Sequence, residues 1–202
     1  MVARLRALGF AVVTFDQPGH GHSTGQLCTL PDFIATLRAV GGRYGNASLA
    51  IAHSLGGAAV TLAQDESWRA EKPILIAPTV DMYAAVRRFF RFVRLGDHLR
   101  EPFFDWLRRH TGVPVDELKV ERKLRVLGQP GLVVHDLDDP DVPWAEGERY
   151  ALHWSGARLL TTFGLGHRRV VDAPEVVEAA LAFLRGEAVG QRVIGSPELA
   201  GI

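Results

Sequence analysis

A serine lies between small residues at positions 52–57, where the chain reads AHSLGG directly after the apolar run 49–51. A strand that turns sharply into a helix needs small neighbours at the turn, and it leaves the serine hydroxyl exposed at the end of the strand. Ser54 is therefore a candidate nucleophile, and the backbone N–H of Leu55 would face a developing oxyanion. Glycine-rich turns with a serine also occur without catalysis, so the motif needs partners elsewhere in the chain.

A serine hydroxyl is a weak nucleophile at neutral pH, so Ser54 needs a base and a group that orients this base. Two downstream loops offer candidates. The apolar run 132–134 is followed by HDLDDPDVP at 135–143, which is rich in carboxylates, and the run 158–162 is followed by FGLGH, which ends at His167. Along the chain these candidates come in the order serine, acid, histidine, which differs from the chain order of the catalytic residues in chymotrypsin and in subtilisin.

The elements that must position these residues alternate along the chain. Segments with helical periodicity, such as 33–44 and 174–184, separate short runs that are almost entirely apolar. Such alternation predicts a mostly parallel sheet, and uniformly apolar strands indicate that helices cover both of its faces. We expect an α/β fold with a doubly wound sheet of at least five strands, at 10–15, 49–52, 73–77, 132–135 and 158–162.

One stretch of about fifty residues has helical patterns and no convincing strand. Within it, apolar residues recur at helical spacing from Tyr83 to Val93, and arginines occupy the remaining face. This pattern leaves three interpretations open: packing against the rest of the protein, a lid over an apolar pocket, or a helix on a membrane surface. The predicted division is a core of 1–78 and 129–186, a helical cap of 79–128 and a tail of 187–202.

Composition restricts the function classes. The chain has 202 residues, and its 23 basic and 23 acidic residues cancel, which argues against a nucleic-acid partner. The single cysteine, Cys28, cannot form an intramolecular disulfide, and no leader or membrane-spanning run is evident, so we expect a soluble cytoplasmic protein without stable membrane insertion. A small neutral substrate fits this balance of charge.

Four motifs resemble those of the α/β-hydrolase superfamily. The elbow AHSLG is similar to the family's Gly-His-Ser-x-Gly, and DQPGHGHS at 16–23 is similar to its Asp-x-Pro-Gly-His-Gly-x-Ser. The stretch 135–143 resembles His-Gly-x-x-Asp-x-x-Val-Pro with Asp136 in place of the glycine, and GLGH at 164–167 resembles Gly-x-Gly-His. The resemblance implies a triad with Ser54 as nucleophile, His167 as general base and then acid, and Asp139 as the orienting carboxylate.

The same resemblance implies that the recorded chain is short at its N-terminus. The family's first strands and its His-Gly loop, which supplies a second oxyanion donor, would precede Met1. We therefore expect an N-terminally truncated fold with an exposed sheet edge, which invites homo-oligomer formation. An alternative to an active enzyme is a weakly active or inactive hydrolase-like module that acts through protein association.

Other residues have simpler interpretations. Asp136, Asp138 and Asp141 are expected to be loop carboxylates that cap the following helix, and Asp81 is an alternative catalytic acid. His53 is expected to pack in the elbow. His20 and His22 lack further ligands at zinc-site spacing, so no metal is expected, and the glycines around them give no phosphate-binding motif.

These inferences together predict a cofactor-independent serine hydrolase. The substrate would be a carboxylic ester with an apolar acyl or alcohol part, cleaved through an acyl-enzyme. Thioesters, lactones, amides and carbon–carbon bonds stay open, because one fold and one triad serve many reactions.

Overall fold

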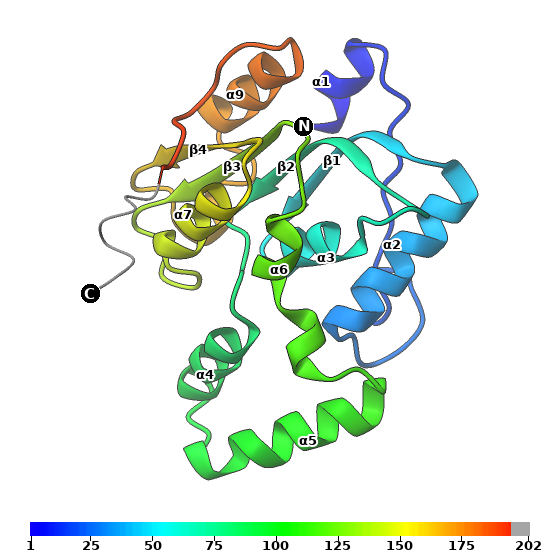
Figure 1. The fold of residues 1–202 in the computed structure, drawn as a ribbon, viewed down its shortest axis with the longest axis vertical. Coiled ribbons are helices and arrows are strands. Elements are labelled where there is room, and N and C mark those ends of the chain that lie inside the picture. Colours follow the sequence, from blue (N-terminus) through cyan, green and yellow to red (C-terminus); the bar gives the residue numbers. More distant parts are fainter. Residues whose placement is uncertain (195–202) are drawn as a thin grey trace.

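A four-stranded parallel sheet organises the protein, which a computed structural model describes over residues 1–194. The strands follow chain order across the sheet, and each pairs in parallel with the next (Figure 1). They are β1 (Ala47–His53), β2 (Ala70–Ile76), β3 (Gly131–Asp136) and β4 (Ala157–Thr162). In the register, Ile51 lies opposite Ile74, and Ile74 lies opposite Leu132.

Helices connect the strands and cover both faces of the sheet, which confirms the predicted doubly wound α/β fold. The α-helices are α1 (Val2–Ala7), α2 (Leu30–Tyr44), α3 (Leu55–Ala63), α4 (Met82–Phe92), α5 (Arg100–Thr111), α6 (Val120–Leu124), α7 (Trp144–His153), α8 (Gly166–Arg169) and α9 (Pro174–Leu184). Two 3-10 turns, η1 (Asp97–Leu99) and η2 (Val115–Leu118), flank α5.

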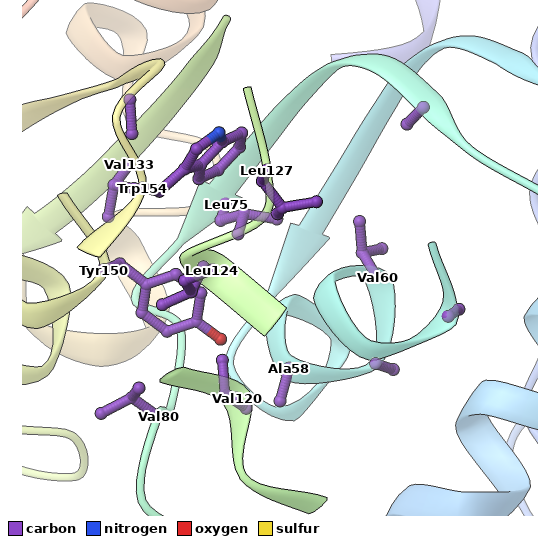
Figure 2. Packing of buried hydrophobic residues seen from close by; sticks show 14 of the residues in the cluster. Ala58, Val60, Leu75, Val80, Val120, Leu124, Leu127, Val133, Tyr150 and Trp154 are labelled. Atoms are coloured by element: carbon purple, nitrogen blue, oxygen red, sulfur yellow. The ribbon is translucent and has the colours of Figure 1, made fainter. Parts of the chain in front are cut away.

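The core divides into two layers because successive side chains of a strand point to opposite faces of the sheet. Leu75 and Val133 join the layer beneath α3, α6 and α7, which includes the buried rings of Tyr150 and Trp154 (Figure 2). Their neighbours along β2 and β3 join the layer beneath α9. Burial on both faces explains why these strands are apolar throughout.

The expected strand at 10–15 is wrong, and the sheet has four strands within residues 1–194 rather than five or more. Val13 and Phe15 are exposed, so in the part of the chain that the structure describes this apolar run has neither the burial nor the ladder partner that a strand of the sheet needs. Phe10 and Val12 do pack near Leu49 and Ile51 of β1. No backbone hydrogen bond joins this segment to β1 within the described residues, so it runs as an extended connection.

Between β2 and β3 the chain is helical, with α4, α5 and α6 and no strand. In Figure 1, α4 and α5 project away from the sheet, and aromatic contacts join them: Tyr83 meets Phe104, and Phe90 meets Phe103. α6 behaves differently, because Val120 and Leu124 are fully buried in the core layer with α3 and α7. The division into a core and a cap at residue 128 stays a prediction.

Glu146 joins this helical segment to the rest of the protein. One carboxylate oxygen accepts hydrogen bonds from the Thr79 hydroxyl at 2.8 Å and the Val80 amide at 2.7 Å, directly after β2. The other oxygen lies 2.6 Å from Nη1 of Arg88 on α4. Because Glu146 is buried, these partners offset the free-energy cost of taking its charge out of water.

The last described residues run along the outer edge of β4. Leu159 and Gln191 exchange two backbone hydrogen bonds of 2.8 Å, and Arg158 donates to the carbonyls of Val189 and Gly190. The remainder of the predicted tail, 195–202, lies outside the described residues. Within residues 1–194, none of the helices has both the length and the apolar character required to span a membrane.

Candidate active site

Ser54 occupies the tight turn between β1 and α3. Its φ of 54° and ψ of −122° lie in a region that residues with a Cβ rarely adopt, which is the strained geometry expected of a nucleophile elbow. Gly57 makes the turn possible, because a Cβ there would lie 2.7 Å from the Cβ of Pro78. Ala52 occupies the first small position of the motif without crowding the turn. A Cβ added to the neighbouring Gly56 would still lie 3.7 Å from the methyl group of Ala52, which is an ordinary van der Waals distance.

Three loops bring Ser54, His167 and Asp139 together at the carboxyl ends of their strands. The Ser54 hydroxyl lies 3.0 Å from Nε2 of His167, and Nδ1 of His167 lies 2.7 Å from Oδ2 of Asp139. A carboxylate only accepts hydrogen bonds, so Nδ1 carries the proton and Nε2 is free to accept one from Ser54. The three residues assigned from sequence thus form one continuous chain of hydrogen bonds.

Asp139 is held as a buried carboxylate. Its side chain is fully shielded from solvent, and its other oxygen accepts from the amides of Asp141 at 2.9 Å and Val142 at 2.8 Å. Burial acts to raise the pKa of Asp139, but the nearby rings of His135 and His167 and the Val142 amide outweigh it and hold the pKa well below its ordinary range. The charge needed to stabilise an imidazolium is therefore present at neutral pH.

His53 contributes to the position of His167, a role that the sequence analysis did not identify. Its Nε2 donates to the backbone carbonyl of His167 at 2.9 Å, and the two ring centroids lie 4.5 Å apart. Burial lowers the pKa of His53, and repulsion from His167 lowers it further, so the ring favours the neutral form. His53 lies beside the nucleophile and holds the backbone of the base.

Asp136 joins the acid loop to the histidine loop. Its Oδ1 accepts from the amides of Asp138 at 3.0 Å and Gly166 at 2.9 Å. Its Oδ2 accepts from the Thr162 hydroxyl at 2.8 Å and the Leu165 amide at 3.1 Å. Burial acts to raise its pKa, but the Gly166, Thr162 and Leu165 hydrogen bonds outweigh it, and the net pKa is lowered.

The expectation that these loop carboxylates cap the following helix is wrong. α7 begins after Pro143 and has no side-chain cap. Asp136 and Asp138 instead accept from the histidine loop, and Asp141 is exposed. The sequence showed acids ahead of a helix, but their donors come from a loop about 26 residues further along the chain.

Replacing Asp136 with asparagine is expected to destabilise the fold by about 2–4 kcal/mol at pH 7, because an amide group must then face backbone donors. Because the pKa of Asp136 is lowered in the folded protein, its carboxylate stabilises the fold at pH values above about 4, the ordinary pKa of aspartate. This contribution to stability disappears as the pH falls through the lowered native pKa. Urea unfolding of Asp136→Asn and wild type across pH checks both points, with exposed Asp141→Asn as the control. Equal stability of all three proteins at pH 7 would contradict the role assigned to Asp136.

The remaining candidates lie away from this hydrogen-bonded chain. Asp81 caps α4 by accepting from the Ala84 amide at 2.9 Å, so its carboxylate is engaged elsewhere. His20 and His22 lie on the exposed loop around Asp16, which accepts from the His22 amide. Within residues 1–194, no cluster of three or more histidine, cysteine or acidic side chains is arranged to hold a metal ion.

Leu55 is the first residue of α3, so its amide N–H has no carbonyl acceptor within that helix. Its N–H forms no backbone hydrogen bond within the described residues. This leaves the amide free beside the Ser54 hydroxyl, as an oxyanion donor requires. The second donor expected from a His-Gly loop stays a prediction.

A parallel sheet that carries a strained serine turn, with histidine and aspartate loops at the same edge, defines the class of proteins to which this fold corresponds. The sequence profile described as the alpha/beta hydrolase family matches residues 1–180. The chain therefore belongs to the alpha/beta hydrolase family, which supports a hydrolase activity. None of the curated proteins matches the sequence.

Solved structures confirm the fold. Rv0554 from Mycobacterium tuberculosis is similar with a TM-score of 0.69 and 19% identity, over 93% of this chain and 84% of that one. A monoacylglycerol lipase from Paleococcus ferrophilus is similar with a TM-score of 0.65 and 19% sequence identity, over 92% of this chain and 86% of the lipase chain. A hydrolase from Pseudomonas aeruginosa PA01 is similar with a TM-score of 0.65 and 22% sequence identity, over 92% of this chain and 84% of that hydrolase.

Proposed function

We propose that the protein is a serine hydrolase that cleaves carboxylic esters through an acyl-enzyme. The observation that carries this proposal is the unbroken chain from the Ser54 hydroxyl to Nε2 of His167, and from Nδ1 of His167 to Asp139. This arrangement of nucleophile, base and orienting carboxylate activates serine for attack on a carbonyl.

In the first half-reaction, Ser54 Oγ bonds to the ester carbonyl carbon while its proton passes to Nε2 of His167. The Leu55 amide hydrogen-bonds to the oxyanion that forms. His167 then gives the proton to the alcohol oxygen as the carbon–oxygen bond breaks, which leaves an acyl group on Ser54. Water deprotonated by His167 attacks this acyl group and releases the acid.

We further propose that the acyl or alcohol part of the substrate is apolar. The support comes from the segment between β2 and β3, which starts at the carboxyl end of β2, where the Thr79 amide donates to the Ser54 carbonyl at 3.4 Å. Its helices α4 and α5 carry an aromatic cluster that includes Tyr83, Phe103 and Trp106. The balanced charge of the chain favours a neutral substrate. The proposed reaction uses only groups of the chain itself, and the cytoplasm stays the predicted location.

A panel of p-nitrophenyl esters, from acetate to long-chain acyl groups, tests both parts of the proposal. Each added methylene that is buried on binding contributes about 0.8 kcal/mol, so kcat/KM is expected to rise about fourfold per methylene until the pocket is filled. Matched thioester, lactone and amide substrates measure the preference for the ester. Hydrolysis no faster than that of the Ser54→Ala variant on every substrate would contradict the proposal.

One observation favours the alternative of a module that acts through association. β1 pairs only with β2 within the described residues, so its outer edge presents unpaired backbone groups on a strand of mostly apolar residues. We propose that a second copy of this chain pairs with that edge. Light scattering after size-exclusion chromatography would then show a dimer, whereas a monomer at all concentrations would contradict the pairing.

A further inference from the structure

Large apolar side chains are exposed where α4 ends and the chain turns toward α5. We call Phe89 together with residues 91–99 the cap tip. Every residue from 91 to 99 is exposed, and the exposed fraction reaches 85% for Phe92 and 55% for Phe89. Val93, Leu95 and Leu99 are also exposed. A contiguous apolar patch of this kind marks an interaction surface in soluble proteins.

The fold itself does not need these side chains for packing. The aromatic residues that join α4 to α5 are Tyr83, Phe90, Phe103 and Phe104. Of the cap tip, only Phe89 has an aromatic contact with one of them, at 6.4 Å between its ring centroid and that of Phe90. The turn is nonetheless well defined. The Leu95 amide bonds to the Phe90 carbonyl at 2.9 Å, and Arg94 adopts a left-handed φ of 56° that closes the helix.

The charge around the cap tip is strongly one-sided. From α4 to the end of the cap tip, residues 82–99 contain four arginines and one acidic residue, Asp97, which pairs with Arg100, although the whole chain is neutral. Arg88 pairs with Glu146 and anchors α4. The other three, Arg87, Arg91 and Arg94, are exposed and form no ion pair within residues 1–194.

We propose that the cap tip docks on an anionic lipid surface. Apolar side chains inserted at the interface and arginines at the level of the phosphates are the two contributions that hold an amphipathic helix on such a surface. A lipid interface accommodates both features of the tip, whereas an acidic protein surface complements the arginines alone. Figure 1 shows that α4 and α5 project from the sheet, so a surface can reach the tip.

Sedimentation of the full chain with phosphatidylglycerol vesicles tests this proposal, with pure phosphatidylcholine vesicles as the neutral comparison. We expect at least tenfold stronger partitioning onto the anionic vesicles, weakened by added salt. Each arginine near an anionic surface strengthens partitioning onto the vesicles by a factor of about five. The double variant Arg91→Gln/Arg94→Gln should therefore partition about 25-fold more weakly than wild type. Phe92→Ser, which removes an exposed ring, should reduce it about tenfold.

Matched controls come from α2, where Tyr44 is 65% exposed and lies beside Arg43. Tyr44→Ser and Arg43→Gln should change partitioning less than twofold. The Ser54→Ala variant should bind vesicles as wild type does, and the tip variants should hydrolyse a soluble short-chain ester normally, so docking and catalysis can fail separately. Equal partitioning onto both kinds of vesicle, or tip variants that bind as wild type does, would overturn the proposal.

Discussion

Asp139→Asn is expected to lower kcat for ester hydrolysis about 10⁴-fold while leaving the fold intact. In wild type, one oxygen of Asp139 accepts from the Asp141 and Val142 amides, and the other accepts from Nδ1 of His167. An asparagine keeps its oxygen toward the two backbone amides, so its NH₂ group faces His167. The imidazole must then place its proton on Nε2, where it can no longer accept the proton of Ser54.

Steady-state kinetics with a p-nitrophenyl ester measure this effect, and circular dichroism reports the fold. Asp138→Asn is the matched control, because Asp138 is exposed in the same loop and accepts from the Gly164 amide rather than from His167. Its kcat should remain within about threefold of wild type. If Asp139→Asn retained more than a tenth of the wild-type kcat, the orienting role of Asp139 would be wrong.

Ser54→Ala is expected to lower kcat at least about 10⁴-fold, since the nucleophile itself is lost. Alanine keeps the Cβ that Ser54 already places at a φ of 54°, so the strained turn gains no new clash. The stability of the variant should stay within about 1 kcal/mol of wild type. Ester kinetics and urea unfolding on the same preparation separate the loss of chemistry from a loss of structure.

The control for this variant lies in the same strand. Ser48 is exposed on β1, six residues before Ser54, and its replacement by alanine should leave kcat unchanged within about twofold. Equal loss of activity in Ser48→Ala and Ser54→Ala would indicate damage to the strand rather than removal of a nucleophile.

The sequence was sufficient to predict where the site residues meet. Ser54, Asp139 and His167 each follow an apolar run, and the carboxyl ends of parallel strands lie at one edge of the sheet. Correctly identified strands therefore bring together residues that lie 28 and 113 positions apart. The resemblance to the α/β-hydrolase superfamily, with its order of serine, acid and histidine along the chain, implied which carboxylate and which histidine join Ser54.

What sequence reasoning missed depends on contacts between distant segments. Three of the four donors to Asp136 lie between Thr162 and Gly166, and those to Glu146 follow β2, so local spacing could not assign either carboxylate. The apolar run at 10–15 predicted a strand, but only Phe10 and Val12 pack against the core, Val13 and Phe15 are exposed, and the segment has no ladder partner among the described residues. The AHSLGG motif likewise predicted packing for His53 and not its hydrogen bond to His167.

The most direct test of the central claim is to locate the adduct of a fluorophosphonate probe by mass spectrometry on the folded protein. Such a probe forms a phosphonyl ester only with an activated serine. The account predicts one adduct, on Ser54, with none in Ser54→Ala and much slower labelling in Asp139→Asn. Labelling of another serine, or no labelling of a protein shown to be folded, would contradict the claim that Ser54, His167 and Asp139 form a working triad.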